Sequence, residues 1–193
     1  MEAHATIMNE PDPIADAIRQ GAYREAVALS ARHHGIALGR FCMALLGDAA
    51  EAEETTQETL IAAFDAFPQY RGEGSVRGFL FGIARRQCAK RLTTQGRRER
   101  RLQLVHDANP ESQTPADLLE RRRRAMRVRD ALEALKPSER EAVVLRYEGE
   151  LSFREVGESC GIDEATARKR VRSNSVSLYV LPTRLACAGV NTR

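Results

Sequence analysis

The sequence predicts an all-α protein made of two small helical domains, a helical bundle and a helix-turn-helix, joined by a flexible linker. Apolar residues recur at helical spacing along most of the 193 residues, and no run shows the sustained alternation of a strand. Residues 103–117 lose this periodicity and are rich in Pro, Asn, Ser and Gln, as linkers are. We therefore expect an N-terminal extension at 1–21, domains at 22–102 and 118–181, and a C-terminal tail at 182–193.

The first domain is predicted to begin with two long helices. One spans 23–46 and ends at Gly47, because glycine interrupts a helix. Asp48 and Glu51 form an N-capping signal for the second helix, which runs to Phe67 and ends before Pro68. The apolar positions of the first helix include Ala26, Leu29, Ile36, Phe41 and Leu45.

The second helix is crowded with carboxylates. Apolar side chains accompany them, namely Leu60, Ile61, Phe64 and Phe67. Carboxylates beside an apolar stripe suit a basic helical partner, so the pattern favours protein docking. An ordinary solvated helix face is the alternative, and no second acidic cluster completes a metal or acid–base site. The carboxylates are Glu51, Glu53, Glu54, Glu58 and Asp65.

A glycine-studded loop, YRGEGSVRG at 70–78, opens the third helix of this domain. The loop lacks the third glycine and preceding strand of a dinucleotide site and the G-K-[ST] of a P-loop, so phosphate chemistry is not expected. One face of the helix is apolar, with Val76, Phe79, Leu80, Ile83 and Gln87 at helical spacing.

Basic residues follow along this helix, close to aromatic ones. Cations interleaved with rings suit a separated nucleic-acid strand, because rings stack on bases and cations follow the backbone. The cations are Arg85, Arg86, Lys90 and Arg91, and the aromatic residues are Tyr70, Phe79 and Phe81.

The second domain is predicted to end in a helix-turn-helix. Capping boxes at Ser138/Glu141 and Ser152/Glu155 start two helices, Gly161 turns the chain and Asp163 caps a final helix. Ala167 and Val171, with Asn174 and Leu178, form the inward face of that helix. Arg168, Lys169 and Arg172 face outward, where such a helix contacts the major groove, and Thr166 can bond a phosphate. A basic surface helix without DNA is the alternative.

Charge is strongly divided along the chain, although the net charge is only +3. Residues 1–67 carry 4 Lys/Arg against 11 Asp/Glu, whereas residues 68–102 carry 10 against 2. One surface can therefore attract a basic partner and another a polyanion.

The four cysteines are scattered, none lies near histidine at metal-ligand spacing, and no metal or cofactor is expected. Without a signal peptide or an apolar span, we expect a cytoplasmic protein with no membrane insertion.

Two blocks of the sequence resemble a known family. LLGDAAEAEETTQETLIAAFDAFPQYRGEGSVRGFLFGIARR is similar to region 2 of the extracytoplasmic-function (group IV) sigma factors of the sigma-70 family, and SEREAVVLRYEGELSFREVGESCGIDEATARKRV is similar to region 4. The resemblance covers roughly 22–102 and 118–181. It implies a non-enzymatic factor that binds core RNA polymerase and promoter DNA and is held in check by an anti-sigma factor.

The resemblance also implies roles for individual residues. Docking on the β′ clamp helices of polymerase is implied for Glu51, Glu53, Glu54, Gln57 and Glu58. Contact with the −10 element is implied for Tyr70, Arg71, Gly72, Glu73, Ser75, Arg85, Arg86, Lys90 and Arg91. Contact with the −35 element is implied for Thr166, Arg168, Lys169, Arg170 and Arg172, on a domain that docks on the β flap.

The chain departs from the family at Arg86, where asparagine is common. Arginine has only donors, whereas asparagine offers a donor and an acceptor to one base edge.

A helix-turn-helix regulator that does not dock on polymerase is the alternative function. It leaves the acidic helix and the 70–78 loop unexplained, and it would usually need a dimer to span two half-sites. No nucleophile, metal cluster or cofactor loop supports an enzyme.

Overall fold

The computed structural model describes residues 12–94 and 126–173, and every regular element within these ranges is helical. The first group comprises α1 (Pro13–Arg19), α2 (Tyr23–Leu46), α3 (Ala49–Ala66), the short 3-10 helix η1 (Phe67–Gln69) and α4 (Val76–Thr94). Helical residues 126–133 lead into the second group, which comprises α6 (Pro137–Tyr147), α7 (Phe153–Cys160) and α8 (Glu164–Ser173). The predicted all-α class is confirmed, whereas the predicted linker and tail, 103–117 and 182–193, lie outside the described residues.

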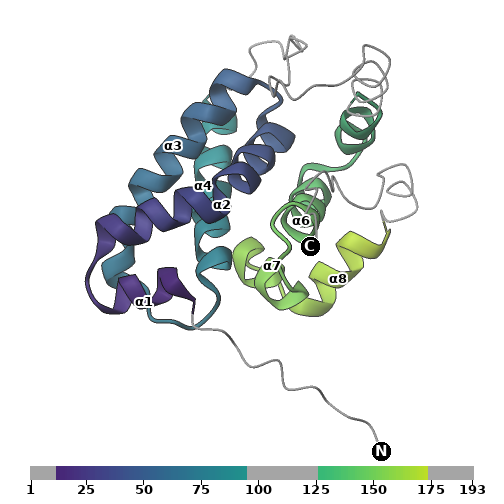
Figure 1. Ribbon diagram of the computed structural model, residues 1–193. Coiled ribbons are helices and arrows are strands. Elements are labelled where there is room, and N and C mark those ends of the chain that lie inside the picture. The colour runs from purple at the N-terminus through teal and green to yellow at the C-terminus, as the bar shows by residue number, and fades with distance from the viewer. Residues whose placement is uncertain (1–11, 95–125, 174–193) are drawn as a thin grey trace, which may run out of the picture.

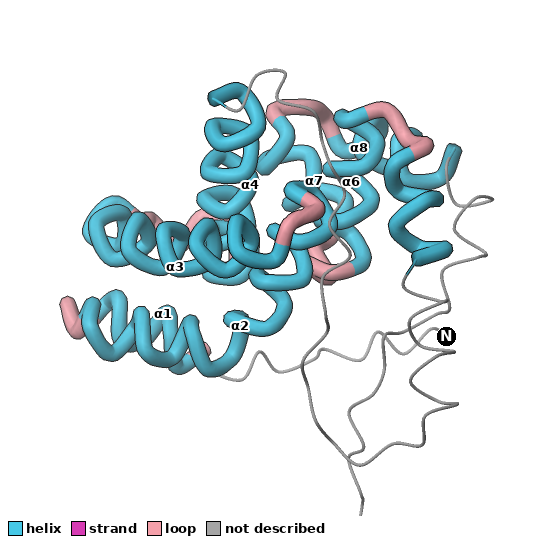
Figure 2. Tube along the Cα trace, turned by 90° about the horizontal axis from the view of Figure 1, so that it is seen from above, coloured by secondary structure: helices cyan, strands magenta, loops and turns pink. Residues whose placement is uncertain are grey.

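The two groups lie side by side and meet along α4. Figure 1 shows α1–α4 on one side and α6–α8 on the other, with α7 against α4. The view from above in Figure 2 has α4 and α7 at the junction. Arg129 contributes a second link, because its Nη2 donates a hydrogen bond of 2.7 Å to the carbonyl oxygen of Gly47. The two groups are therefore in direct contact.

Local signals set the ends of α2 and α3, as predicted. Gly47 ends α2 in the left-handed region at φ 78°, which glycine adopts without strain. The carboxylate of Asp48 accepts a hydrogen bond of 2.9 Å from the amide of Glu51 and so caps α3. Phe41 of α2 packs edge-to-face on Phe81 of α4, with ring centroids 5.4 Å apart, and both rings are fully buried.

Two expectations for the first domain differ from the structure. Residues 13–19 belong to its core, not to a separate extension, because α1 buries Ile14, Ala17 and Ile18 against α2. Asp12 caps α1 and Pro13 starts it, a combination that favours a helix N-terminus. Ile36 is 74% exposed, although its spacing along α2 placed it among the core positions.

Of the two capping boxes predicted in the second domain, one is present and the other is absent. Ser152 and Glu155 form the reciprocal pair at the start of α7, and Asp163 caps α8 by accepting a bond of 2.8 Å from the Thr166 amide. Ser138 does not cap α6, since that helix starts at Pro137 after Lys136 without a side-chain cap. Its supposed partner Glu141 instead bonds to Arg85 of the first domain.

Gly157 sets the distance between α7 and the turn that follows it. A β-carbon at this position would lie 2.7 Å from the carbonyl oxygen of Ile162, which is a backbone atom and cannot rotate away. We expect Gly157→Ala to lower the free energy of unfolding of the second domain by about 1–3 kcal/mol, the usual range for overpacking. Chemical unfolding followed by circular dichroism measures this change.

Gly35 provides the matched control for this prediction. It is also a helix-interior glycine, but a β-carbon there would meet nothing within 4 Å. Gly35→Ala should stabilise the protein by about 0.5–1 kcal/mol, because alanine favours the helix over glycine. Equal stabilisation by Gly157→Ala would show that the helix-turn-helix does not need glycine here.

Candidate protein and nucleic-acid interfaces

One stripe of α3 is exposed along its length. Glu53, Gln57, Ile61 and Phe64 follow one another at helical spacing, and all four are exposed, Ile61 by 66% and Phe64 by 39%. We call these four residues the α3 stripe. Its N-terminal half is acidic and polar, and its C-terminal half is apolar. Phe67, which the sequence grouped with this apolar face, is only 1% exposed and belongs to the core.

Two of the predicted docking carboxylates are instead engaged within the chain. Glu54 and Glu58 form ion pairs with Arg91 of α4, at 2.7 and 2.9 Å. Hydrogen bonding and charge from Arg91 hold the pKa of Glu54 below its ordinary value. Arg91 is only 18% exposed, so it ties α4 to α3 and does not extend from a DNA-facing surface in this arrangement. From the sequence, Glu54 and Glu58 were assigned to the polymerase-docking surface and Arg91 to the −10 surface.

The loop between η1 and α4 is held by its own tyrosine. The hydroxyl of Tyr70 donates a hydrogen bond of 2.5 Å to the carbonyl oxygen of Gly74, and burial raises the pKa of this phenol. Gly72 takes a left-handed conformation at φ 75°. Arg71 and Glu73 are exposed at the loop tip. The loop therefore presents a charged tip on a fixed base.

Two of the three aromatic residues near this loop, Phe79 and Phe81, face the core. Phe81 is fully buried against Phe41, and Phe79 is half-buried. Phe79 stacks on Phe67 with centroids 6.1 Å apart, and its ring lies 5.1 Å from that of Tyr70. The expectation that these rings form a platform for a nucleic-acid strand is therefore wrong for Phe79 and Phe81. Phe81 belongs to the core, and Phe79 packs against it.

The predicted cations of α4 divide into two sets. Arg86 and Lys90 are exposed, and the described part of the chain gives neither an ion-pair partner. Arg85 faces the second domain, where its Nε and Nη2 donate hydrogen bonds of 3.1 and 3.0 Å to Glu141 of α6. Contact between Arg85 and DNA requires this pair to separate.

Other contacts join the start of α4 to the second domain. Ser75 donates a hydrogen bond to the carboxylate of Glu155, and this bond together with those from Ser152 keeps the pKa of Glu155 low despite burial. Arg77 donates to the backbone carbonyls of Glu148 and Gly149 and pairs with Glu150 at 3.1 Å. Sequence reasoning missed Arg77 because its partners lie more than 70 residues away.

The Arg85–Glu141 pair predicts how the domains respond to a mutation. Glu141→Ala leaves the half-buried Arg85 without this acceptor, so we expect the contact between the domains to weaken by about 1 kcal/mol. A larger radius of gyration in small-angle X-ray scattering would report the separation. Glu164→Ala is the control, since Glu164 pairs with Arg168 within α8 at 2.6 Å, and α8 packs on α6 and α7. An unchanged radius for Glu141→Ala would contradict a role for this pair.

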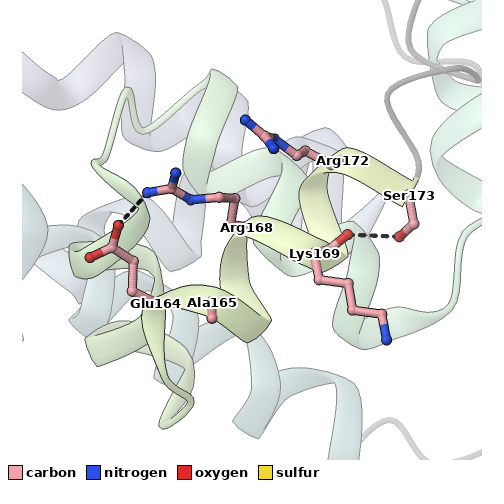
Figure 3. Close-up of a pocket in the computed structure, with 6 residues that line it drawn as sticks. All are labelled: Glu164, Ala165, Arg168, Lys169, Arg172 and Ser173. Carbon is pink, nitrogen blue, oxygen red and sulfur yellow. Dashed lines mark hydrogen bonds and ion pairs between the residues drawn. The ribbon is translucent and has the colours of Figure 1, made fainter.

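The outward face of α8 is basic and hollowed. Arg168, Lys169 and Arg172 line a shallow cavity together with Glu164, Ala165 and Ser173 (Figure 3). Arg168 pairs with Glu164 at 2.6 Å, whereas Lys169 extends away from the helix in this view. Ala167 and Val171 are buried, as predicted, which fixes the opposite face. Asn174 and Leu178 lie outside the described residues.

Two predicted residues of α8 lie away from this hollow. Arg170 is half-buried on another side of the helix and does not line it. The hydroxyl of Thr166 donates a hydrogen bond of 2.6 Å to Asp163, whose pKa is lowered by this bond and by the Thr166 amide. Contact of the Thr166 hydroxyl with a phosphate requires that bond to break.

The described residues contain no cluster of three or more side chains suited to a metal ion. Cys42 and Cys88 are buried free thiols, and Cys160 is half-buried and free. No helix in the described ranges combines the length and apolar character needed to cross a bilayer.

Comparison with known proteins assigns both domains to one family. The model of sigma-70 region 2 matches residues 31–98, and a model of sigma-70 region 4 matches 125–172. The chain is 31% identical over 142 residues to the ECF RNA polymerase sigma factor SigE of Mycolicibacterium smegmatis, covering 72% of this chain and 55% of that protein. It is 30% identical over 145 residues to SigL of Mycobacterium tuberculosis, covering 72% and 78%. The match thus spans little more than half of SigE.

Solved structures agree with the fold. CnrH, in complex with the cytosolic domain of CnrY, superimposes with a TM-score of 0.63 at 20% identity, over 87% of this chain and 94% of that one. The sigma factor RpoE from Bartonella quintana, in complex with the anti-sigma factor NepR, gives 0.63 at 21% identity over 83% and 96%. Together with the family models and the SigL match, the helical architecture shows that this chain belongs to the extracytoplasmic-function group of sigma-70 family RNA polymerase sigma factors.

Proposed function

We propose that this chain directs core RNA polymerase to specific promoters and thereby starts transcription. One observation carries the proposal: each of the two matched regions has an exposed surface, and the two surfaces differ in charge. The α3 stripe in region 2 is acidic and apolar, and the α8 hollow in region 4 is basic. A protein partner suits the first surface and a polyanion suits the second. In this proposal the polymerase supplies the chemistry, and the chain acts in the cytoplasm without catalysis of its own.

Exposure supports two of the residues proposed to contact polymerase. Glu53 and Gln57 are exposed on the α3 stripe, so we assign them the docking role on the β′ clamp helices. Glu51, Glu54 and Glu58 lie nearby, but Glu54 and Glu58 also hold Arg91. These two carboxylates contribute mainly to the α3–α4 packing that supports the stripe. Contact of region 4 with the β flap belongs to the same proposal.

The proposed −10 contacts combine the loop tip with the exposed part of α4. Arg71 and Glu73 at the tip, with Arg86 and Lys90 along the helix, remain accessible in the arrangement seen here. Ser75 and Arg85 contact the second domain, so they become accessible to DNA only when the domains separate. Contact of Ser75 and Arg85 with promoter DNA would therefore require the two domains to move apart on the polymerase.

We also propose control by an anti-sigma factor. The Bartonella quintana RpoE structure holds that sigma factor with the anti-sigma factor NepR, and the fold is shared. An inhibitor that covers the α3 stripe would compete directly with polymerase. Affinity capture of the tagged chain across growth conditions tests this, and the absence of an inhibitor in every condition would contradict it.

Run-off transcription tests the main proposal. Purified core polymerase is incubated with and without the chain on a library of genomic fragments from its own organism, and new transcripts are sequenced. We expect discrete new start sites whose upstream sequences share two elements. Binding of polymerase without transcripts would contradict promoter activity, and no binding at all would favour a helix-turn-helix regulator that works without polymerase.

A further inference from the structure

Two arginines lie over the ring of one phenylalanine in the helix-turn-helix. The guanidinium carbon of Arg146 is 4.9 Å from the ring centroid of Phe153, and that of Arg168 is 5.1 Å from the same centroid. Both distances are within the range of a cation–π interaction. Arg146 comes from α6, Phe153 from the start of α7 and Arg168 from α8, so the cluster joins all three helices of this domain.

The Phe153 end of this cluster is fixed by its neighbours. Ser152 caps α7 immediately before the ring, and its amide donates a hydrogen bond of 2.8 Å to Glu155 in return. Arg146 is held as well, because its Nη1 donates a bond of 2.6 Å to the carbonyl oxygen of Leu151. The ring and the first guanidinium therefore form a rigid support.

Arg168 packs on this support from the third helix, α8. Its side chain is 45% exposed at the edge of the α8 hollow, and it also pairs with the carboxylate of Glu164 four residues earlier. A free arginine side chain loses rotamer freedom when it binds, and prior ordering reduces that loss. Orientation matters further, since a guanidinium reads guanine through two parallel hydrogen bonds in the plane of the base.

We propose that Phe153 is a positioning residue that orients the guanidinium of Arg168 for reading a base edge. The inference rests on the proposed contact of α8 with promoter DNA. It adds Phe153, a residue outside α8, to the residues that support this contact. Arg146 contributes by holding the ring from the other helix. Sequence reasoning gave Phe153 no role, because its two arginine neighbours are 7 and 15 positions away.

Binding of duplex DNA by the full chain tests this proposal. Duplexes are first selected from a randomised pool with the wild-type chain, and affinity is then measured for the selected duplex and a scrambled one. Phe153→Leu keeps an apolar side chain but removes the aromatic face. We expect it to reduce the ratio of the two affinities roughly two- to fivefold, the range that an exposed cation–π contact supports. Phe153→Tyr should retain the ratio.

A double-mutant cycle separates positioning from simple packing. Phe153→Leu should have no further effect on discrimination in an Arg168→Ala background, because the ring acts through that arginine. The salt dependence of binding should stay unchanged in Phe153→Leu, since no phosphate-contacting charge is removed. These two readouts would not follow from a structural role of the ring.

Three results would overturn the inference. Equal weakening on both duplexes, together with a lower melting temperature, would assign Phe153 to folding alone. If Phe153→Leu discriminates between the selected and the scrambled duplex as well as the wild type does, Phe153 has no positioning role. The proposed function would then remain intact. Failure of the wild type to select any duplex, in the chain alone and bound to polymerase, would overturn both proposals together.

Discussion

Glu53→Lys is expected to weaken the binding of core RNA polymerase by about tenfold. Glu53 is exposed at the acidic end of the α3 stripe, and our proposal sets this end against basic helices of the polymerase. Reversal places like charges opposite each other, which costs more than the loss of one attraction. Gln57→Lys, one turn further on, should add to the effect. Affinity is measured by fluorescence anisotropy of the labelled chain titrated with core polymerase at fixed ionic strength.

Asp130→Lys is the matched control for this experiment. It makes the same change of charge at an exposed position in the second domain, outside α3. Affinity should therefore remain close to that of the wild type. Glu54→Lys is less informative, because it also breaks the ion pair with Arg91 between α3 and α4. Equal weakening by Glu53→Lys and Asp130→Lys would attribute the effect to net charge and remove the docking role of the α3 stripe.

Arg168→Ala and Arg172→Ala should both weaken binding to a duplex that carries the −35 element. Both side chains line the hollow on α8. A lost contact with a base edge costs about 1–3 kcal/mol and relaxes specificity at that base, whereas a lost phosphate contact weakens binding to every sequence. Each lost phosphate contact should also reduce the slope of log affinity against log salt by about 0.9. Titration at several salt concentrations therefore distinguishes the two kinds of contact.

Arg170→Ala is the control within the same helix. It removes the same charge from a half-buried side chain that does not line the hollow. Its salt slope and its discrimination between duplexes should match those of the wild type. A change equal to that of Arg168→Ala would mean that DNA contacts a different side of α8 from the one inferred here.

Features that depend on neighbours in the chain were predictable from the sequence. The bounds of α2 and α3, the Ser152–Glu155 box and the Asp163 cap all follow from contacts within a few residues. Capping at Ser138 was the exception. Pro137 occupies the first position of α6, and Glu141 pairs with Arg85 across the domain boundary.

The sequence by itself determined the helical class, most helix ends and the side of α8 that is buried, because short-range hydrogen bonds and apolar periodicity decide these features. Only the tertiary structure decided which charged residues remain exposed. Arg85 and Arg91 read as one basic face with Arg86 and Lys90, yet folding pairs the first two with carboxylates from distant segments. The packing of whole helices decides which charged side chains form ion pairs. The spacing of residues along a single helix carries no information about that packing.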